Sequence, residues 1–159
     1  MVLRPSYPAG VPCWMELVPT DQDEAVDFYT SVFPDGEVIE RTVQDGELYI
    51  ATFRAGGIEF AAMNAEGGPP FSEAVSFVVL CDDQAEVDRY WDALLAGGGR
   101  PSQCGWLSDR FGVSWQVTPK RLLELQSDPD PGRRRRAVAE MLTQVKIDIA
   151  ALERAADGD

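Results

Sequence analysis

A repeated segment constrains the fold of this chain more than any other feature of the sequence. Residues 14–29 (WMELVPTDQDEAVDFY) align with residues 76–91 (SFVVLCDDQAEVDRYW) at an offset of 62 residues, with identical Asp, Gln and Glu residues at three paired positions. In each copy, an apolar strand-like run leads to an aspartate suited to cap a helix, and further acids occupy the first turn. The repeat predicts a strand, a short turn and a helix, used twice.

The residues after each copy extend the repeat into a larger unit. A first helix is expected at about 21–33, followed by strands at about 37–44, 47–55 and 57–64, separated by Asp45-Gly46 and Gly56-Gly57 turns. A second helix is expected at about 83–97, followed by shorter strands near 101–109 and 112–118. The chain therefore predicts one βαβββ module at residues 1–73 and a second, shortened one at residues 74–118.

Residues 119–159 are predicted to form a helical C-terminal segment. An apolar stripe with spacings of three, four and seven runs through Val138, Met141, Leu142, Val145, Ile149 and Leu152. This stripe must pack on the domain's own sheet or on a partner copy. The run Arg133–Arg136 near the start of the segment is interpreted as a solvated face or as a neutraliser of the acidic half, and not as a nucleic-acid site.

The charge distribution argues against two classes of partner. The net charge is −13, and residues 1–100 carry 5 basic and 18 acidic side chains, against 9 and 9 in residues 101–159. Nucleic acids and anionic membranes both require basic surfaces, so neither is an expected partner. No apolar run reaches the roughly 18 residues of a membrane helix, and the start MVLRPSYPAG lacks a signal peptide's apolar core. A cytoplasmic location is therefore expected.

The residue types present limit the chemistry. The sequence contains no histidine, which removes imidazole bases, Ser-His-Asp triads and histidine-ligated metal sites. Three widely separated cysteines, Cys13, Cys81 and Cys104, suit reduced thiols better than a disulfide or a zinc cluster. Cys104 has no evident neighbour that would lower its pKa and activate it as a nucleophile.

Two βαβββ modules in one short chain resemble the vicinal oxygen chelate superfamily, which includes glyoxalase I, extradiol dioxygenases, and fosfomycin- and bleomycin-resistance proteins. More specifically, several segments look like the PhnB-like branch, which is often labelled 3-demethylubiquinone-9 3-methyltransferase: 28-FYTSVFP-34, 74–91, 105-GWLSDRFGVSWQVTP-119, 127–131 and 147–155. The first strand, residues 10–17, looks more like other non-metal members. The resemblance implies an α+β fold in which two βαβββ modules form a curved eight-stranded sheet around a cavity, with C-terminal helices added. We also expect a homodimer.

The resemblance further implies where a metal would bind. Metal-using members place His, Glu, His and Glu on four cavity strands, and these positions fall on Trp14, Ala61, Ser76 and Gln116. An indole, a methyl group, a hydroxyl and a neutral amide are too few donors with too little charge to hold zinc, iron or manganese. We therefore expect no metal and no cofactor.

Strand alternation predicts the rest of the cavity lining. If the four positions point inward, a uniformly apolar set points toward the helices: Cys13, Met15, Leu17, Ile58, Phe60, Phe77, Val79, Cys81, Val113, Trp115 and Val117. The cavity then also receives Glu16, Val18, Glu59, Met63, Val78, Leu80, Ser114 and Thr118. The predicted ligand-binding residues are Trp14, Ala61, Met63, Ser76, Ser114 and Gln116, and Trp14 is the favoured stacking partner for a planar ligand.

Two functions remain open. The first is metal-independent binding of a small apolar or aromatic molecule in the cavity between the modules. The second is a metal-free isomerase or lyase that uses Glu16 or Glu59 as the general base, although either carboxylate can equally be a hydrated, inert rim group. Methyl transfer from S-adenosylmethionine is not expected, because the cluster Gly97-Gly98-Gly99 follows a helix instead of a first parallel strand.

Overall fold

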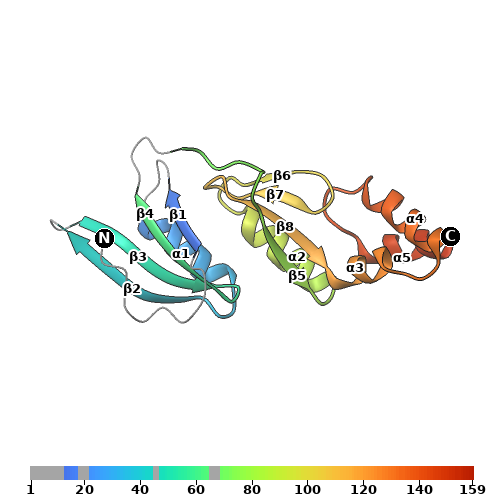
Figure 1. The fold of residues 1–159 in the computed structure, drawn as a ribbon, viewed down its shortest axis with the longest axis horizontal. Coiled ribbons are helices and arrows are strands. Elements are labelled where there is room, and N and C mark those ends of the chain that lie inside the picture. Colours follow the sequence, from blue (N-terminus) through green and yellow to red (C-terminus); the bar gives the residue numbers. More distant parts are fainter. Residues whose placement is uncertain (1–12, 18–21, 45–46, 65–68) are drawn as a thin grey trace. The chain divides into compact units, whose positions relative to one another are not determined.

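The computed structural model describes residues 13–17, 22–44, 47–64 and 69–159, and residues 13–17 enter only through their backbone pairing. The chain divides into two compact units, Met1–Pro70 and Phe71–Asp159, each of which is considered by itself. Both units combine helices with one four-stranded sheet, so the predicted mixed α+β class is confirmed (Figure 1). The single curved sheet of eight strands around a cavity stays a prediction.

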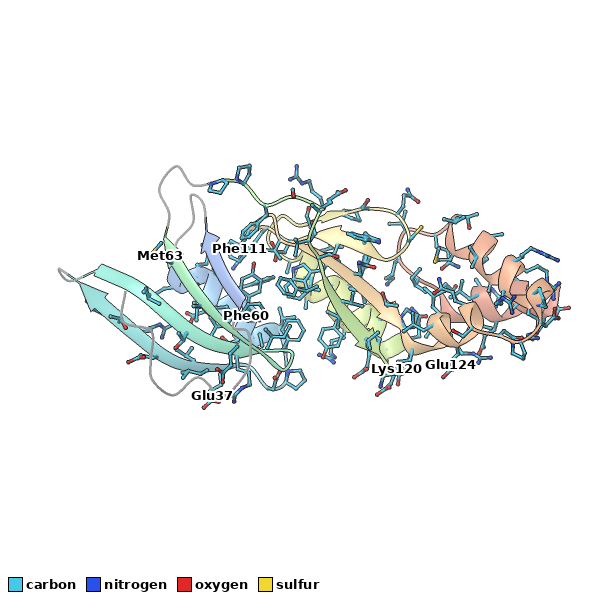
Figure 2. All side chains as sticks on the ribbon, viewed as in Figure 1. Glu37, Phe60, Met63, Phe111, Lys120 and Glu124 are labelled. Atoms are coloured by element: carbon cyan, nitrogen blue, oxygen red, sulfur yellow. The ribbon has the colours of Figure 1, made fainter. Side chains whose placement is uncertain are left out.

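The first unit follows the predicted order of elements. Its elements are β1 (Cys13–Leu17), α1 (Gln22–Val32), β2 (Glu37–Gln44), β3 (Glu47–Ala55) and β4 (Ile58–Asn64). The sheet order is β1-β4-β3-β2, with β1 parallel to β4 and the other pairs antiparallel. Tyr29 on α1 stacks on Phe53, and Phe53 stacks on Phe60, which is labelled in Figure 2, so these rings form the core beneath the helix. Phe60 is buried as alternation predicts, whereas Ile58, beside the Gly56-Gly57 turn, is partly exposed.

The second unit repeats this order with shorter strands. Its first five elements are β5 (Phe77–Cys81), α2 (Gln84–Leu95), β6 (Arg100–Pro101), β7 (Trp106–Ser108) and β8 (Ser114–Pro119), and the sheet order is β5-β8-β7-β6. Asp83 caps α2 as predicted, because its Oδ1 accepts a hydrogen bond from the Glu86 amide at 2.9 Å. The Glu86 carboxylate in turn accepts from the Asp82 amide at 2.9 Å, which secures the entry to the helix.

Three helices end the chain, and they correct the predicted apolar stripe. They are α3 (Lys120–Gln126), α4 (Pro131–Met141) and α5 (Ile149–Asp157), and they enclose a small core of Leu122, Leu125, Ala137, Ile147, Leu152 and Ala156. The stripe is not one continuous face, because α4 ends at Met141 and Asp148 begins a new helix by capping the Ala151 amide. Leu142 and Val145 therefore stay 61% and 41% exposed instead of joining this core.

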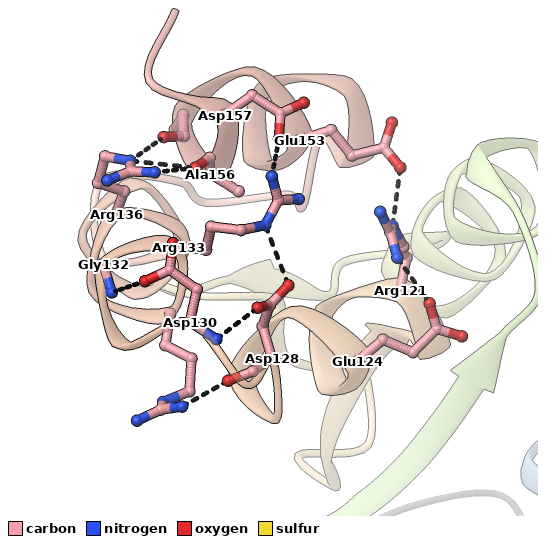
Figure 3. Close-up of polar contacts among 12 residues, drawn as sticks. Arg121, Glu124, Asp128, Asp130, Gly132, Arg133, Arg136, Glu153, Ala156 and Asp157 are labelled. Carbon is pink, nitrogen blue, oxygen red and sulfur yellow. Dashed lines mark hydrogen bonds and ion pairs between the residues drawn. The ribbon is translucent and has the colours of Figure 1, made fainter.

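The arginine run at the start of α4 holds these helices together (Figure 3). Arg133 forms ion pairs with Asp128, at 3.0 Å, and with Asp157. Arg136 donates to the carbonyl oxygens of Ala155 and Ala156 at the end of α5. These partners all belong to residues 119–159, so the interpretation that the run neutralises the acidic half is wrong for these two arginines.

Candidate functional site

One face of the second sheet is covered by α2. Val79, Cys81, Trp115 and Val117 are buried on this side, as alternation predicts. The opposite face, which we call the open face of the second sheet, comprises Ser76, Val78, Leu80, Trp106, Ser114, Gln116 and Thr118. Ser114 and Thr118 are buried there, whereas Val78 and Leu80, two aliphatic side chains on the same face of β5, are 53% and 48% exposed.

The cross-strand register forms a row of complementary side chains on this face. Val78 on β5 lies opposite Gln116 on β8, and Gln116 lies opposite Trp106 on β7. The aliphatic side chain of Val78, the amide of Gln116 and the indole of Trp106 are therefore neighbours across three strands. Trp106 is half-buried here, whereas Trp115 lies in the core, where its Nε1 donates to Asp109 at 2.8 Å.

The residues at two of the four positions where the superfamily places metal ligands are hydrogen-bonded to each other. Gln116 Nε2 donates a hydrogen bond to Ser76 Oγ at 2.8 Å, across 40 residues of sequence. The amide nitrogen and the hydroxyl oxygen thus satisfy one another, and neither carries a charge that would replace the hydration of a divalent cation. Ala61, the third position, is a buried methyl group. These three residues do not fit a metal ion.

The corresponding face of the first sheet is charged. Arg54 on β3 forms ion pairs at 2.9 Å with Glu59 on β4 and with Glu37 on β2. Hydrogen bonding to Glu59 raises the pKa of the Arg54 guanidinium above its ordinary value. The Arg54 guanidinium thus holds the Glu59 carboxylate in an ion pair.

The backbone register places the other predicted residues of the first unit. Ala61 is paired with Trp14, and half-buried Met63 with Glu16, although the side chains of Trp14 and Glu16 lie outside the described residues. Glu59 stands four residues from Met63 along β4, about 13 Å at the rise of a strand. Glu16 and Glu59 therefore occupy separate parts of the sheet and cannot form a directly paired carboxylate dyad.

Asp109 is a key residue that the sequence interpretation missed. It is buried, and its Oδ1 accepts hydrogen bonds from the amides of Phe111 and Val113 at 2.9 and 3.0 Å, while Oδ2 accepts from Trp115. The motif DRFGVSW therefore closes the turn between β7 and β8. The signal that could have revealed this role is an aspartate three residues before a turn glycine, Gly112, which has a φ of 87°.

The two described cysteines differ in exposure. Burial, followed by the nearby Glu86 carboxylate, raises the pKa of the Cys81 thiol to about 12, so this thiol stays protonated at neutral pH. Cys104 is half-buried in a loop, where its amide donates to the Gln144 carbonyl at 2.8 Å. No group of three or more metal-ligating side chains occurs among the described residues.

The glycine cluster ends a helix, as its sequence position predicts. The Gly99 amide donates to the Leu95 carbonyl at 3.0 Å, and Gly97 has a φ of 77°. The cluster thus lies at the carboxyl end of α2, where free carbonyl groups and not amide groups face outward. Within the described part of the chain, no helix is long and apolar enough to cross a membrane.

Comparison with known proteins fixes the family. The model of the family described as 3-demethylubiquinone-9 3-methyltransferase matches residues 11–118, which is more than half of the chain. The chain belongs to this family. The match spans both βαβββ modules and stops two residues before α3 begins.

Two solved structures share the fold of this family member, and a further relative matches it in sequence. The PhnB protein of Bacillus cereus is 27% identical, with a TM-score of 0.62, over 69% of this chain and 98% of that one. The fosfomycin resistance protein FosX of Mesorhizobium loti is 18% identical, with a TM-score of 0.50, over 69% of this chain and 90% of that one, and shows the fold alone. CFP32 of Mycobacterium bovis, which is named as a glyoxylase, is 31% identical over 63% of this chain. That match spans only 38% of the relative's length.

Proposed function

We propose that this PhnB-like protein binds a small apolar or aromatic molecule, without a metal ion, on the open face of the second sheet. The observation that carries the proposal is the hydrogen bond from Gln116 to Ser76, set among the exposed side chains of Val78 and Leu80. Small-molecule sites commonly combine a mainly apolar surface with a few placed polar groups that fix orientation.

The polar pair defines what the ligand must offer. Gln116 Nε2 already donates to Ser76 Oγ, whereas Gln116 Oε1 and the Ser76 hydroxyl hydrogen have no hydrogen-bond partner among the described residues. A neutral ligand with one acceptor and one donor complements these groups. Val78 and Trp106 then contact its apolar body from both sides of the amide.

Binding is favoured over catalysis by the state of Glu59. Its carboxylate is held by Arg54 at 2.9 Å, and Glu59 belongs to the first unit, whereas the proposed ligand surface belongs to the second. The metal-free isomerase or lyase, with Glu16 or Glu59 as its base, is the second candidate. The homodimer, the cytoplasmic location and the cavity between the modules stay predictions.

The proposal is tested by chemical-shift mapping of the full chain with indole and 2-naphthol as probes. We expect shifts at residues 76–80, 106 and 114–118, and weaker binding in Gln116→Leu and Ser76→Ala. Each lost hydrogen bond is expected to weaken binding several-fold. Ser102→Ala removes a hydroxyl from an exposed loop outside this face and serves as the matched control.

Two outcomes would contradict the proposal. One is a shift map that leaves the open face of the second sheet unperturbed by either probe. The other is marked thermal stabilisation of the chain by zinc, nickel or manganese that is abolished in Gln116→Leu. Turnover lost in Glu59→Gln, with probe binding retained, would favour the enzyme instead.

A further inference from the structure

A groove along α4 lies outside both the sheet face described above and the residues that the family model matches. It has a volume of about 430 Å³ and is lined by Gln126, Arg134, Arg135, Val138, Ala139 and Leu142. Arg134, Val138 and Leu142 follow each other at intervals of four residues, so they form one edge of the groove over about 12 Å of helix. One end of the groove is therefore basic, and the other is apolar.

The two arginines of the groove differ from four other arginines of the chain. Arg41, Arg54, Arg121 and Arg133 each hold two carboxylates. Within the described residues, neither Arg134 nor Arg135 forms an ion pair; Arg134 donates to the Asp128 carbonyl oxygen, and the Asp128 carboxylate is paired with Arg133. In a chain with 27 acidic and 14 basic side chains, two arginines that form no ion pair among the described residues line one groove, which makes its surface complementary to an anion.

The start of α4 adds little to this complementarity. Its first turn carries no acidic residue, but Asp130 caps the helix, and its Oδ1 accepts a hydrogen bond from the Gly132 amide at 2.7 Å, so this carboxylate already counters the positive end of the helix dipole. An anion beside Arg134 and Arg135 would therefore gain from the two guanidinium groups and not from the dipole.

The apolar end requires a ligand with a hydrophobic part. Leu142 is 61% exposed because the chain leaves the helix at this residue, and Val138 and Ala139 continue the surface toward the arginines. Gln126 bridges to the neighbouring helix through Met141 Sδ at 3.5 Å, which fixes the far wall. A purely ionic ligand would leave this apolar surface in water.

We propose that the α4 groove binds a single-chain amphipathic carboxylate, with the carboxylate at Arg134 and Arg135 and the alkyl chain along Val138, Ala139 and Leu142. Arginine recognises carboxylates through paired N–H donors, and the alkyl chain covers the exposed leucine. This site is separate from the open face of the second sheet, so an experiment can refute this proposal without refuting the proposed function, and the reverse.

Decanoate below its micellar concentration is the probe, titrated into the isotope-labelled full chain. We expect amide shifts confined to residue 126 and residues 134–142, and no comparable binding of decyltrimethylammonium. The double variant Arg134→Gln/Arg135→Gln should weaken decanoate binding about tenfold or more, since a charge-assisted contact is lost at each site. Arg154→Gln, on the exposed side of α5, is the matched control and should bind as the native chain does.

A second substitution separates loss of binding from loss of folding. Leu142→Ser shortens the apolar end at an exposed position, so it should keep the helical circular dichroism spectrum and still weaken decanoate several-fold. Val75→Ser, at another exposed apolar residue, is its control. Equal binding of the alkyl cation, unchanged affinity in the double arginine variant, or shifts only on the second sheet would overturn the proposal. Binding to anionic phosphatidylglycerol vesicles without binding of free decanoate would also overturn it.

Discussion

The two sheets have the same strand order but differ in strand length and in how their last hairpin is closed. In β1-β4-β3-β2, strands β2 and β3 have 8 and 9 residues, whereas their counterparts β6 and β7 in the second sheet have 2 and 3. A long ladder supplies enough backbone hydrogen bonds to define its own register, and a short one does not. Both copies of the repeat therefore have the same topology, but the second copy needs other interactions to hold its last hairpin in register.

Each unit uses an aspartate at this hairpin, but from a different place. In the first unit, Asp35, in the loop after α1, accepts from the amides of Gly56 and Gly57 at 2.9 and 2.6 Å. The residue 62 positions after Asp35 is Gly97, and a side chain there would meet Arg110 at 2.8 Å. The second unit instead closes the turn from within, through buried Asp109.

Substitution of Asp109 should have the largest effect on the free energy of unfolding. Asp109→Ala leaves three donors, two of them backbone amides, without their acceptor in a buried turn. We expect a loss of about 3–4 kcal/mol in the free energy of unfolding, because buried donors are left unsatisfied. Urea denaturation followed by tryptophan fluorescence measures it, since Trp115 is one of the three donors.

A matched substitution shows whether this loss depends on the buried turn. Asp92→Ala removes an exposed aspartate from α2 and should change the free energy of unfolding by less than about 0.5 kcal/mol. If Asp109→Ala were no more destabilising than Asp92→Ala, the buried turn would not be what closes the second sheet.

Substitution of Asp35 should lower the free energy of unfolding less than substitution of Asp109. Asp35→Ala removes acceptors from two exposed amides, which water can then solvate, so we expect a loss of about 1 kcal/mol. Hydrogen exchange at Gly56 and Gly57 should accelerate, while exchange in the central residues of β3 and β4 should change little. A loss equal to that of Asp109→Ala would show that the long hairpin depends on its loop as strongly as the short one.

These two aspartates also show what the sequence could and could not predict. The helices and most strands of both modules follow from apolar alternation, turn pairs and the Asp83 cap, which are local signals. The strand region expected near 101–109 is instead divided into β6 and β7, with residues 102–105 between them. The burial of Phe60, Val79 and Trp115 follows from the same alternation. The role of Asp109 depends on a side chain six residues away folding back onto it, and no periodic pattern records such a contact.

The candidate functional site shows the same limit of prediction from sequence. The resemblance to the superfamily, followed by strand alternation, predicts Ser76 and Gln116 on one face, and their hydrogen bond is consistent with that prediction. The ion pair of Glu59 with Arg54 was not foreseen, because it joins two strands through a register that depends on the Gly56-Gly57 turn. The apolar stripe of the last helices failed because the break at residues 142–148 follows from capping by Asp148, a competing local signal.

The helices of the two units differ as well, because α2 is held by the C-terminal segment. Gln84 on α2 donates to the Ile147 carbonyl at 3.1 Å and accepts from the Ile149 amide at 3.0 Å. Lys146 adds an ion pair to Asp88, one turn further along α2, at 2.7 Å. This polar contact fastens the segment before α5 to the helix of the second module.

The smallest effect we expect is on the titration of Asp88. Hydrogen bonds from Lys146 and then from Gln84 lower the pKa of Asp88 below its ordinary value. A carboxylate with a lowered folded pKa adds stability above its unfolded pKa of about 3.9, and that stability is lost as the pH falls through the folded pKa. Lys146→Met should raise the pKa of Asp88, as measured by NMR titration of its carboxyl carbon. The stability difference between the native chain and Lys146→Met should then shrink as the pH falls from about 5 to about 3.

Because Asp88 is partly exposed, solvent screening should keep the effect of Lys146→Met on stability small. Lys120→Met is the control, since Lys120 pairs with Asp82 and should leave the titration of Asp88 unchanged. An equal shift of Asp88 in both variants would mean that the overall charge of the unit, and not the contact with the C-terminal segment, sets its pKa. A shift confined to Lys146→Met would instead show that a specific polar contact joins α2 of the second module to the segment before α5.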